Sequence, residues 1–394
     1  MKTATADTTG RPHVLIINSV LMGGGVDSHT LSLCSACLQA GVRVTLAVAR
    51  QARWLPRARA IAGLELLELN RHRQTWPLLL ARHARAHAVD LIHAHHGRDY
   101  WVALLARWFA LCRPRVVVTR HLMTTLKDKT RRLLAPPTRV VAVSAAVMGA
   151  LRRADPAGTL ALTQIHCGID TTVFRPEGEG AGEPALLPAG PPATRAATRA
   201  ALGYAPDDVV FVVVGPTHGP DGKGQFYFVT AAAQLAQRCP QARFLCVGDG
   251  DRVGALRAEA VRLGLADRFS ARPFTDDVPA LMRAVDVLVH PAVNSEALGL
   301  VILEALACAR PVIGSALDGI GETFVDAEHG LLVPPRDAPA LAAAMERLAG
   351  DAALRARYGR AGRAWVEAHF SLTTLGERTA RLYREILAEE GARA

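Results

Sequence analysis

The apolar positions of this chain fall in short aliphatic runs that alternate with longer amphipathic stretches. In the first half the runs are rich in β-branched residues, and helical patterns follow them, as in a parallel α/β sheet. Glycines 23–25 follow the first run, and we predict a helix from about Ser28 to Gln39. The predicted strands of this half are 14–18, 42–48, 64–69, 91–93, 116–119, 140–143 and 162–165.

The same alternation restarts after a change in composition. Residues 176–192 are mostly Gly, Pro, Glu and Ala with little to bury, which indicates a linker or a flexible insertion. We predict further strands at 209–214, 243–247, 268–271, 285–289, 312–313 and 330–333. Predicted helices cover 339–349, 353–368 and 372–390.

The fold class that this pattern predicts is α/β, with two doubly wound parallel-sheet domains in tandem. A chain of 394 residues is too long for one ordinary core and suits two domains of about 150–200 residues. We expect a first domain at 1–175, a linker at 176–193, a second domain at 194–371 and a closing helix at 372–394 that packs back on the first domain. Ligands of such folds bind at the carboxyl ends of the strands, so a cleft between the domains is the expected site.

The overall composition favours a globular protein outside the membrane. The chain is 50% apolar and 21% charged. No run approaches the roughly 18 apolar residues of a membrane span, and Val14–Ile17 fits a strand better than a signal sequence. The seven cysteines are scattered and odd in number, which favours reduced thiols. We therefore expect a cytoplasmic location.

Charge separates the two halves of the chain. Residues 1–180 hold 24 Lys and Arg against 11 Asp and Glu, whereas the remainder holds 22 against 25. The basic half favours an anionic partner, such as a membrane surface or an anionic glycolipid. Nucleic acid is disfavoured, because aromatic residues are only 5% and no nucleic-acid-binding motif is present. The basic segment 127–132 is a solvated helix face or, as the alternative, a peripheral contact with the anionic inner face of the plasma membrane.

The most informative motif pairs Glu296 with Glu304. An apolar strand precedes the pair, and the residues Leu298-Gly299-Leu300 predict a helix entrance between the two acids. Glu296 should then lie in the loop and Glu304 inside the helix, with the free N–H groups of the helix start available to a phosphate. A buried helix with two acids is costly unless they have partners, so a ligand is a better explanation than a solvated face. Carboxylates on both sides of a phosphate describe a nucleotide-sugar site.

Further motifs follow one another in a characteristic order along the chain. They are 23–25, 116–121, 141–144, 165–174, Lys223-Gly224, 247–250, the pair Glu296 and Glu304, and Glu322 before 330–334. This ordered set resembles the retaining glycosyltransferases of family 4 (group 1), whose GT-B fold has two Rossmann-like domains facing a central cleft. The resemblance covers nearly the whole chain and is strongest over 209–335.

The resemblance implies which residues hold the phosphates of the donor. Gly24 and Gly25 would let the backbone approach the diphosphate. Lys223 would neutralise the phosphates as the leaving group gains charge. Gly299 and Leu300 would offer backbone N–H groups to the same phosphates.

It also implies which residues hold the rest of the donor. Glu304 would accept hydrogen bonds from the ribose hydroxyls and Glu296 from hydroxyls of the transferred sugar. His121 would lie beside that sugar and help to stabilise positive character at the anomeric carbon. Asp249 and Gly250 fall where the nucleobase pocket of the family begins.

The implied activity is retaining, metal-independent transfer of a sugar from a nucleotide-sugar donor, expected to be UDP-linked. The acceptor would be a glycan or glycolipid of bacterial lipopolysaccharide or polysaccharide biosynthesis. We expect no cofactor and no metal, because Asp249-Gly250-Asp251 lies at the nucleobase pocket rather than at a diphosphate. The segment 93–97, with three histidines, is interpreted as structural or as part of the acceptor side rather than as a metal site.

Two departures from the family pattern leave alternatives open. Pro216 stands where the phosphate-binding arginine is usual, which keeps open a catalytically weakened, sugar-nucleotide-binding partner subunit. Ala309 stands where Gly is frequent, which we interpret as a packing variation.

A nucleotide-sugar epimerase would need acid/base residues that are not found. A dinucleotide oxidoreductase is disfavoured by the glycine spacing at 248–254.

Overall fold

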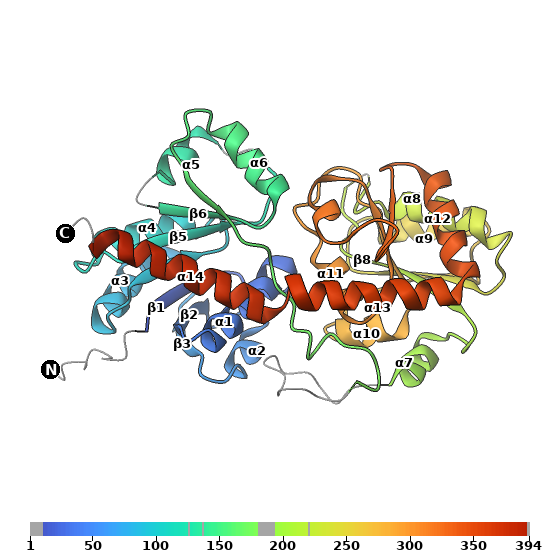
Figure 1. The fold of residues 1–394 in the computed structure, drawn as a ribbon, viewed down its shortest axis with the longest axis horizontal. Coiled ribbons are helices and arrows are strands. Elements are labelled where there is room, and N and C mark those ends of the chain that lie inside the picture. Colours follow the sequence, from blue (N-terminus) through green and yellow to red (C-terminus); the bar gives the residue numbers. More distant parts are fainter. Residues whose placement is uncertain (1–10, 125–126, 136–137, 180–193, 220, 392–394) are drawn as a thin grey trace. The chain divides into compact units, whose positions relative to one another are not determined.

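The computed structural model describes residues 11–124, 127–135, 138–179, 194–219 and 221–391 (Figure 1). These residues form two compact units. The first unit contains 11–170 and 370–391, and the second contains 171–179 and 194–369. Of the predicted linker, residues 180–193 lie outside the described residues, as do the first ten and last three residues of the chain.

The first unit is built on a seven-stranded parallel sheet. The strand order is β3-β2-β1-β4-β5-β6-β7, so the chain reverses its direction of winding between β1 and β4. That reversal is the point at which doubly wound folds bind ligands. The strands are β1 (His13–Asn18), β2 (Arg43–Ala49), β3 (Glu65–Leu69), β4 (Leu91–Ala94), β5 (Arg115–Arg120), β6 (Thr138–Ala142) and β7 (Ala161–Gln164).

Helices cover both faces of this sheet, and the last helix of the chain is one of them. Within the unit, α14 packs along α1 at a contact where a Cβ on Gly376 would collide with the backbone of Ala36. The Tyr383 hydroxyl of α14 lies 2.7 Å from His93 Nδ1 in β4. The helices are α1 (Gly25–Gln39), α2 (Leu55–Arg59), η1 (Arg73–Thr75), α3 (Trp76–Ala86), α4 (Tyr100–Phe109), α5 (Asp128–Leu133), α6 (Ala145–Ala154) and α14 (Leu372–Gly391).

The second unit repeats this plan with a six-stranded parallel sheet. Its order is β10-β9-β8-β11-β12-β13, and the reversal lies between β8 and β11. Strand β8 is buried from Val209 to Val213 and its Phe211 packs with Phe228 and Phe244 in the core. The strands are β8 (Val209–Val214), β9 (Ala242–Val247), β10 (Phe269–Arg272), β11 (Val287–His290), β12 (Val312–Ser315) and β13 (Gly330–Val333).

The helices of the second unit form two layers. Helices α8, α9 and α12 pack together, and α7, α10, α11 and α13 form the other group (Figure 1). They are α7 (Arg195–Leu202), α8 (Gln225–Ala236), α9 (Val253–Arg262), α10 (Val278–Ala284), α11 (Leu300–Ala307), η2 (Asp318–Glu322), α12 (Ala338–Gly350) and α13 (Ala352–His369).

The predicted strands are confirmed, each to within two residues at either end. The predicted start of the first helix at Ser28 is wrong, because α1 begins three residues earlier at Gly25. The side chain of Asp27 is the physical reason. Its Oδ2 accepts hydrogen bonds from the N–H groups of Met22 (2.8 Å) and Gly23 (2.9 Å), which turns the chain so that the helix begins at the last of the three glycines. Among the described residues, no helix is long and apolar enough to cross a bilayer.

Candidate functional site

In the second unit, the loop after β8 brings Lys223 to the carboxyl edge of the sheet. Gly224 follows with φ 86° and caps α8. A Cβ at Gly224 would collide with the carbonyl of Pro291, the residue after β11, so only glycine lets the two loops approach this closely. The buried Gln225 side chain fixes the loop, because its Oε1 accepts from Lys223 N (2.6 Å) and its Nε2 donates to Gly215 O (3.2 Å).

Lys223 and His290 converge on one carboxylate oxygen of Glu296. Lys223 Nζ lies 2.8 Å from Glu296 Oε2, and His290 Nε2 lies 3.1 Å from the same oxygen. Burial opposes ionisation of Glu296, but the hydrogen bond and charge of His290 and the charge of Lys223 outweigh it and lower its pKa to about 2. Glu296 is therefore a fixed anion at neutral pH, with a cation beside it.

The prediction for the helix after Glu296 is confirmed. Glu296 lies in the loop, Gly299 caps α11 with φ 85°, and Leu300 is the first helical residue. This left-handed φ favours glycine, and a Cβ at Gly299 would also lie 3.0 Å from Ile302 Cδ1. The first N–H groups of α11 thus begin next to Glu296, as an anion site at a helix N-terminus requires.

Glu304 lies one turn inside α11 and differs from Glu296 in its surroundings. Among the described residues, no hydrogen bond or ion pair to the Glu304 carboxyl is found, and burial raises its pKa to about 7. A half-buried carboxyl without a protein partner is costly. Hydroxyl groups of a ligand would supply the missing partners.

The residues predicted for the nucleobase lie on the neighbouring strand end. Asp249 and Gly250 follow β9, which pairs with β8. Asp249 Oδ1 accepts from the backbone N–H of Phe274 (3.3 Å), and a Cβ at Gly250 would collide with the backbone of Thr217. Both residues therefore border the loop that leads from β8 to Lys223.

Pro216 and His218 occupy the loop where the family usually has an arginine. The carbonyl of Pro216 accepts from Gln225 Nε2 at 3.3 Å. His218 Nδ1 lies 3.0 Å from Asp251 Oδ1, and both side chains are exposed. Within this loop as described, Lys223 is accordingly the cation closest to Glu296.

In the first unit, the glycine loop and Asp27 form the carboxyl edge at β1. Gly24 has φ 111° and precedes the first helical residue, Gly25. The Asp27 carboxylate also accepts from Asn18 Nδ2 (2.9 Å) and lies 3.0 Å from His96 Nε2. Burial opposes its ionisation, but the hydrogen bonds from His96, Asn18 and Gly23 prevail and lower its pKa.

His121 follows β5 in the first unit and belongs to a cluster of histidines. His121 Nε2 lies 3.3 Å from His95 Nδ1, and its ring centroid lies 4.9 Å from that of His29. Burial, followed by the charges of neighbouring histidines, lowers the pKa of His95 and His121, and burial alone lowers that of His29 to about 4. At neutral pH these rings are uncharged acceptors and donors of hydrogen bonds.

The same three histidines are the described residues that could hold a metal ion. One ring nitrogen of each of His29, His95 and His121 lies within 4.8 Å of the others. Neutral imidazoles of this kind suit zinc and related ions. The expectation that no metal is needed stays a prediction, and so does the interpretation of residues 93–97 as structural or acceptor-side.

Sequence reasoning did not anticipate several partners of the predicted residues. It missed the contact of His290 with Glu296 and the contribution of His29 to the cluster around His121. The signal available for His290 was its place at the end of β11, next to the strand reversal. His29 carried no comparable signal, since it lies on an apolar helix.

The fold and these strand ends define a class of protein. Two Rossmann-like units, each with loops at the strand reversal of its parallel sheet, form the GT-B architecture. Residues 23–173 match the family model described as Glycosyltransferase Family 4, and residues 208–351 match the one described as Glycosyl transferases group 1. The D-inositol 3-phosphate glycosyltransferase of Saccharomonospora viridis is 31% identical over 331 residues, 76% of this chain and 70% of that protein. The chain belongs to the group 1, family 4 glycosyltransferases.

Two further similarities bear on the extent of this match. The alpha-D-kanosaminyltransferase of Streptomyces kanamyceticus is 33% identical over 166 residues, which cover 42% of this chain and less than half (43%) of that relative. The crystal structure of HepE from Anabaena in complex with UDP and glucose has a TM-score of 0.79 and 21% identity, covering 95% of this chain and all of that one (100%). The latter similarity concerns the fold.

Proposed function

We propose that this protein transfers a sugar, with retention of anomeric configuration, from a nucleotide-sugar donor to a glycan or glycolipid acceptor. The observation that carries the proposal is the convergence of Lys223 and His290 on Glu296 beside the start of α11. A cation and free N–H groups suit the diphosphate of a leaving nucleotide, and the adjacent carboxylate suits the hydroxyls of a sugar.

The donor would lie along the loops at the β8–β11 reversal. Its diphosphate would take Lys223 and the N–H groups of Gly299 and Leu300, and its ribose would take the unpartnered Glu304. Its sugar would take Glu296, and its base would begin at Asp249 and Gly250. The donor is UDP-linked in this proposal, as expected from the family resemblance.

Residues of the first unit have roles of their own in this proposal. Gly24 and Gly25 would allow the backbone to approach the diphosphate, and the neutral His121 would contact a sugar hydroxyl. As C–O cleavage proceeds, the anomeric carbon gains positive character and the diphosphate gains charge. We propose that these acceptors and cations stabilise both changes and that transfer proceeds without a metal.

The acceptor side is also proposed from the first unit. Its excess of Lys and Arg suits an anionic acceptor, and the exposed basic helix α5 suits peripheral contact with an anionic bilayer. This combination fits the synthesis of lipopolysaccharide or another polysaccharide at the cytoplasmic face of a bacterial membrane.

The experiment is a donor panel. Purified protein in EDTA is incubated with UDP-, GDP- and dTDP-sugars, and release of the nucleoside diphosphate is measured. We expect slow release from one donor, and a newly formed linkage of unchanged anomeric configuration by NMR once an acceptor is found. Release that requires an added divalent metal would contradict metal independence.

Pro216 favours one second candidate, a donor-binding partner subunit with little activity of its own. The loop lacks the usual arginine, and His218 is engaged with Asp251. Donor binding by calorimetry without any release of nucleoside diphosphate would select this candidate over the transferase.

A further inference from the structure

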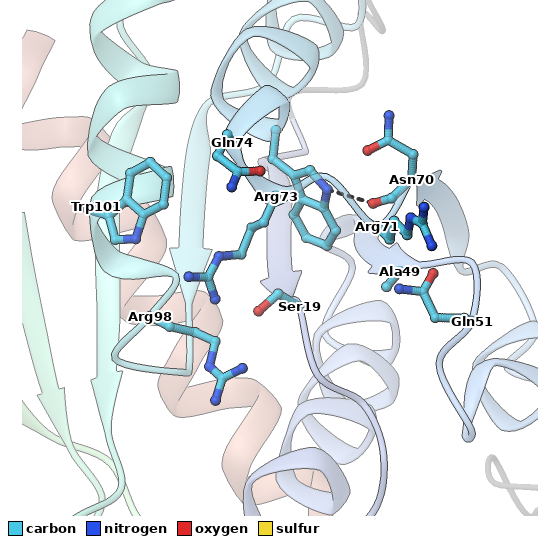
Figure 2. A pocket seen from close by; sticks show the side chains of 10 residues that line it. Ser19, Ala49, Gln51, Asn70, Arg71, Arg73, Gln74, Arg98 and Trp101 are labelled. Atoms are coloured by element: carbon cyan, nitrogen blue, oxygen red, sulfur yellow. Dashed lines mark hydrogen bonds between the residues drawn. The ribbon is translucent and has the colours of Figure 1, made fainter.

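The first unit contains a pocket that is lined by none of the residues proposed above to bind the donor. Its volume is about 350 Å³, within the range of small-molecule sites. Figure 2 shows its polar lining, which comes from the ends of β1, β2 and β3 and from the loop after β4. It lies therefore at the carboxyl edge of the sheet, beside the reversal between β1 and β4, where doubly wound folds bind ligands.

Three arginines line this pocket without an acid. Arg71 and Arg73 come from the segment after β3, and Arg98 comes from the loop after β4. The described lining contains no Asp or Glu, and no ion pair is found for these three arginines among the described residues. Figure 2 shows Arg73 and Arg98 on one side of the pocket and Arg71 on the other, beside Asn70. Positive charges gathered on one lining repel one another, and an anion bound there would remove that cost.

One acid, Asp99, interacts electrostatically with Arg73 but is not part of the pocket lining. Asp99 is fully buried at the start of α4, and its Oδ2 accepts from the backbone N–H of Ser19 (3.0 Å). Burial raises the pKa of Asp99, against the opposing effects of Ser19 and Arg73. Asp99 therefore holds Ser19 at the pocket, while its own carboxyl lies outside the lining.

The remaining lining suits a polyhydroxylated molecule. Asn70, Gln51 and Gln74 offer amide groups, and the indole of Trp101 offers an apolar face. The Arg73 guanidinium carbon lies 5.8 Å from the centre of the Trp101 ring. Amides with an aromatic ring bind the hydroxyls and the C–H face of a sugar or polyol, and arginines bind its anionic substituent.

We propose that this pocket binds a phosphate group carried by the sugar acceptor, so that the enzyme selects phosphorylated acceptors. One carboxylate is satisfied by a single bidentate arginine, whereas three arginines match the higher charge and the additional oxygens of a phosphate. This inference rests on the proposed transferase function and names its acceptor class. The phosphate belongs either to a soluble sugar phosphate or to a phosphorylated lipid.

The test compares arginine variants of the full-length protein. Binding of glucose 6-phosphate, inorganic phosphate and glucose is measured by calorimetry for the wild type, Arg73→Gln, Arg98→Gln and the control Arg82→Gln, an exposed arginine on α3 outside the pocket. We expect each pocket variant to weaken binding of the two phosphates about tenfold. Arg82→Gln should change the affinity for the two phosphates less than twofold. No variant should bind glucose more tightly than the wild type does.

Vesicles distinguish the two sources of phosphate. The fraction of protein that sediments with phosphatidic acid vesicles is measured for each variant. A smaller fraction for Arg73→Gln but not for Arg82→Gln would assign the phosphate to a lipid. Calorimetric binding of glucose 6-phosphate without any change in sedimentation would assign it to a soluble acceptor. Phosphate affinities within twofold of the wild type in both pocket variants, with unchanged sedimentation, would overturn the proposal.

Binding of nucleotide is measured on the same samples to separate this proposal from the function it rests on. The pocket variants should bind UDP as the wild type does, because the proposed donor residues are unchanged. If the wild type neither binds nor hydrolyses any sugar nucleotide, the transferase proposal fails, regardless of the result for phosphate binding. If the donor is used but the phosphate affinity is the same in Arg73→Gln, Arg98→Gln and the wild type, only the acceptor inference fails.

Discussion

Glu296 and Glu304 are eight residues apart, yet their surroundings shift their pKa values in opposite directions. Lys223 and His290 hold Glu296 ionised, with a pKa of about 2, whereas burial without a partner raises the pKa of Glu304 to about 7. Environments that separate two carboxyls in this way are typical of functional sites. Glu296 is thus stable without a ligand, and Glu304 is the residue that a ligand would satisfy.

We predict that Glu304→Gln stabilises the free protein but weakens nucleotide binding. A carboxyl whose pKa rises on folding, from 4.5 to about 7, loses its favourable contribution as the pH increases between those values. Above pH 7 the half-buried charge of Glu304, without a protein partner, is destabilising, so the amide should raise Tm at pH 8 by about 3 °C. Loss of a charged acceptor for the ribose should weaken binding of the nucleoside diphosphate about 10–100-fold.

Calorimetry and thermal unfolding at pH 5 and pH 8 measure both effects. The gain in Tm should vanish at pH 5, where Glu304 is already protonated. Glu328→Gln, an exposed acid of the same unit, serves as the control and should change neither quantity. Unchanged nucleotide affinity in Glu304→Gln would remove Glu304 from the donor site.

At the scale of elements, helix α11 begins at the candidate donor site and ends in the core of the second unit. It begins at Gly299 beside Glu296 and ends at Ala307, and the chain then turns through Ala309. Ala309 has φ 54°, in the left-handed region that favours glycine. The interpretation of Ala309 as a packing variation is therefore incomplete. The glycine that is frequent there in the family adopts a left-handed φ more readily than alanine does.

We predict that Ala309→Gly stabilises the protein. Relief of the left-handed strain, about 1–2 kcal/mol, should exceed the greater entropy of glycine in the unfolded chain, for a net gain of about 0.5–1 kcal/mol. The same substitution two residues earlier, Ala307→Gly, replaces the last residue of α11, which has no positive φ, and should instead destabilise the protein by up to about 1 kcal/mol. Urea unfolding of both variants measures their free energies of unfolding. Changes of the same sign in the two variants, relative to the wild type, would contradict this account.

Elements were predicted more reliably than contacts because strands are a local property of the sequence. Runs such as Val209–Val214 are apolar throughout, since both faces of a parallel strand are buried. The start of α11 was also predictable, because Gly299 marks the entrance. The partners of Glu296 were not, because Lys223 lies 73 residues away and meets it only through the order of the strands. The arginine pocket likewise assembles residues from four separate loops.

At the scale of the molecule, one chain carries two units of the same plan with different chemistry at their edges. The second unit presents Lys223, Glu296 and a helix start, which suit a charged, hydroxylated donor. The first unit presents neutral histidines around His121 and an arginine pocket, which suit a sugar and an anionic acceptor. The division of charge along the sequence thus follows the proposed division of substrates.

The most direct measurement is a crystal structure of the full chain with the nucleoside diphosphate of the donor that it turns over. We predict the diphosphate against Lys223 Nζ and the N–H groups of Gly299 and Leu300, with the ribose hydroxyls on Glu304. A nucleotide bound elsewhere, or one whose ribose leaves the Glu304 carboxyl without a partner, would contradict the central claim.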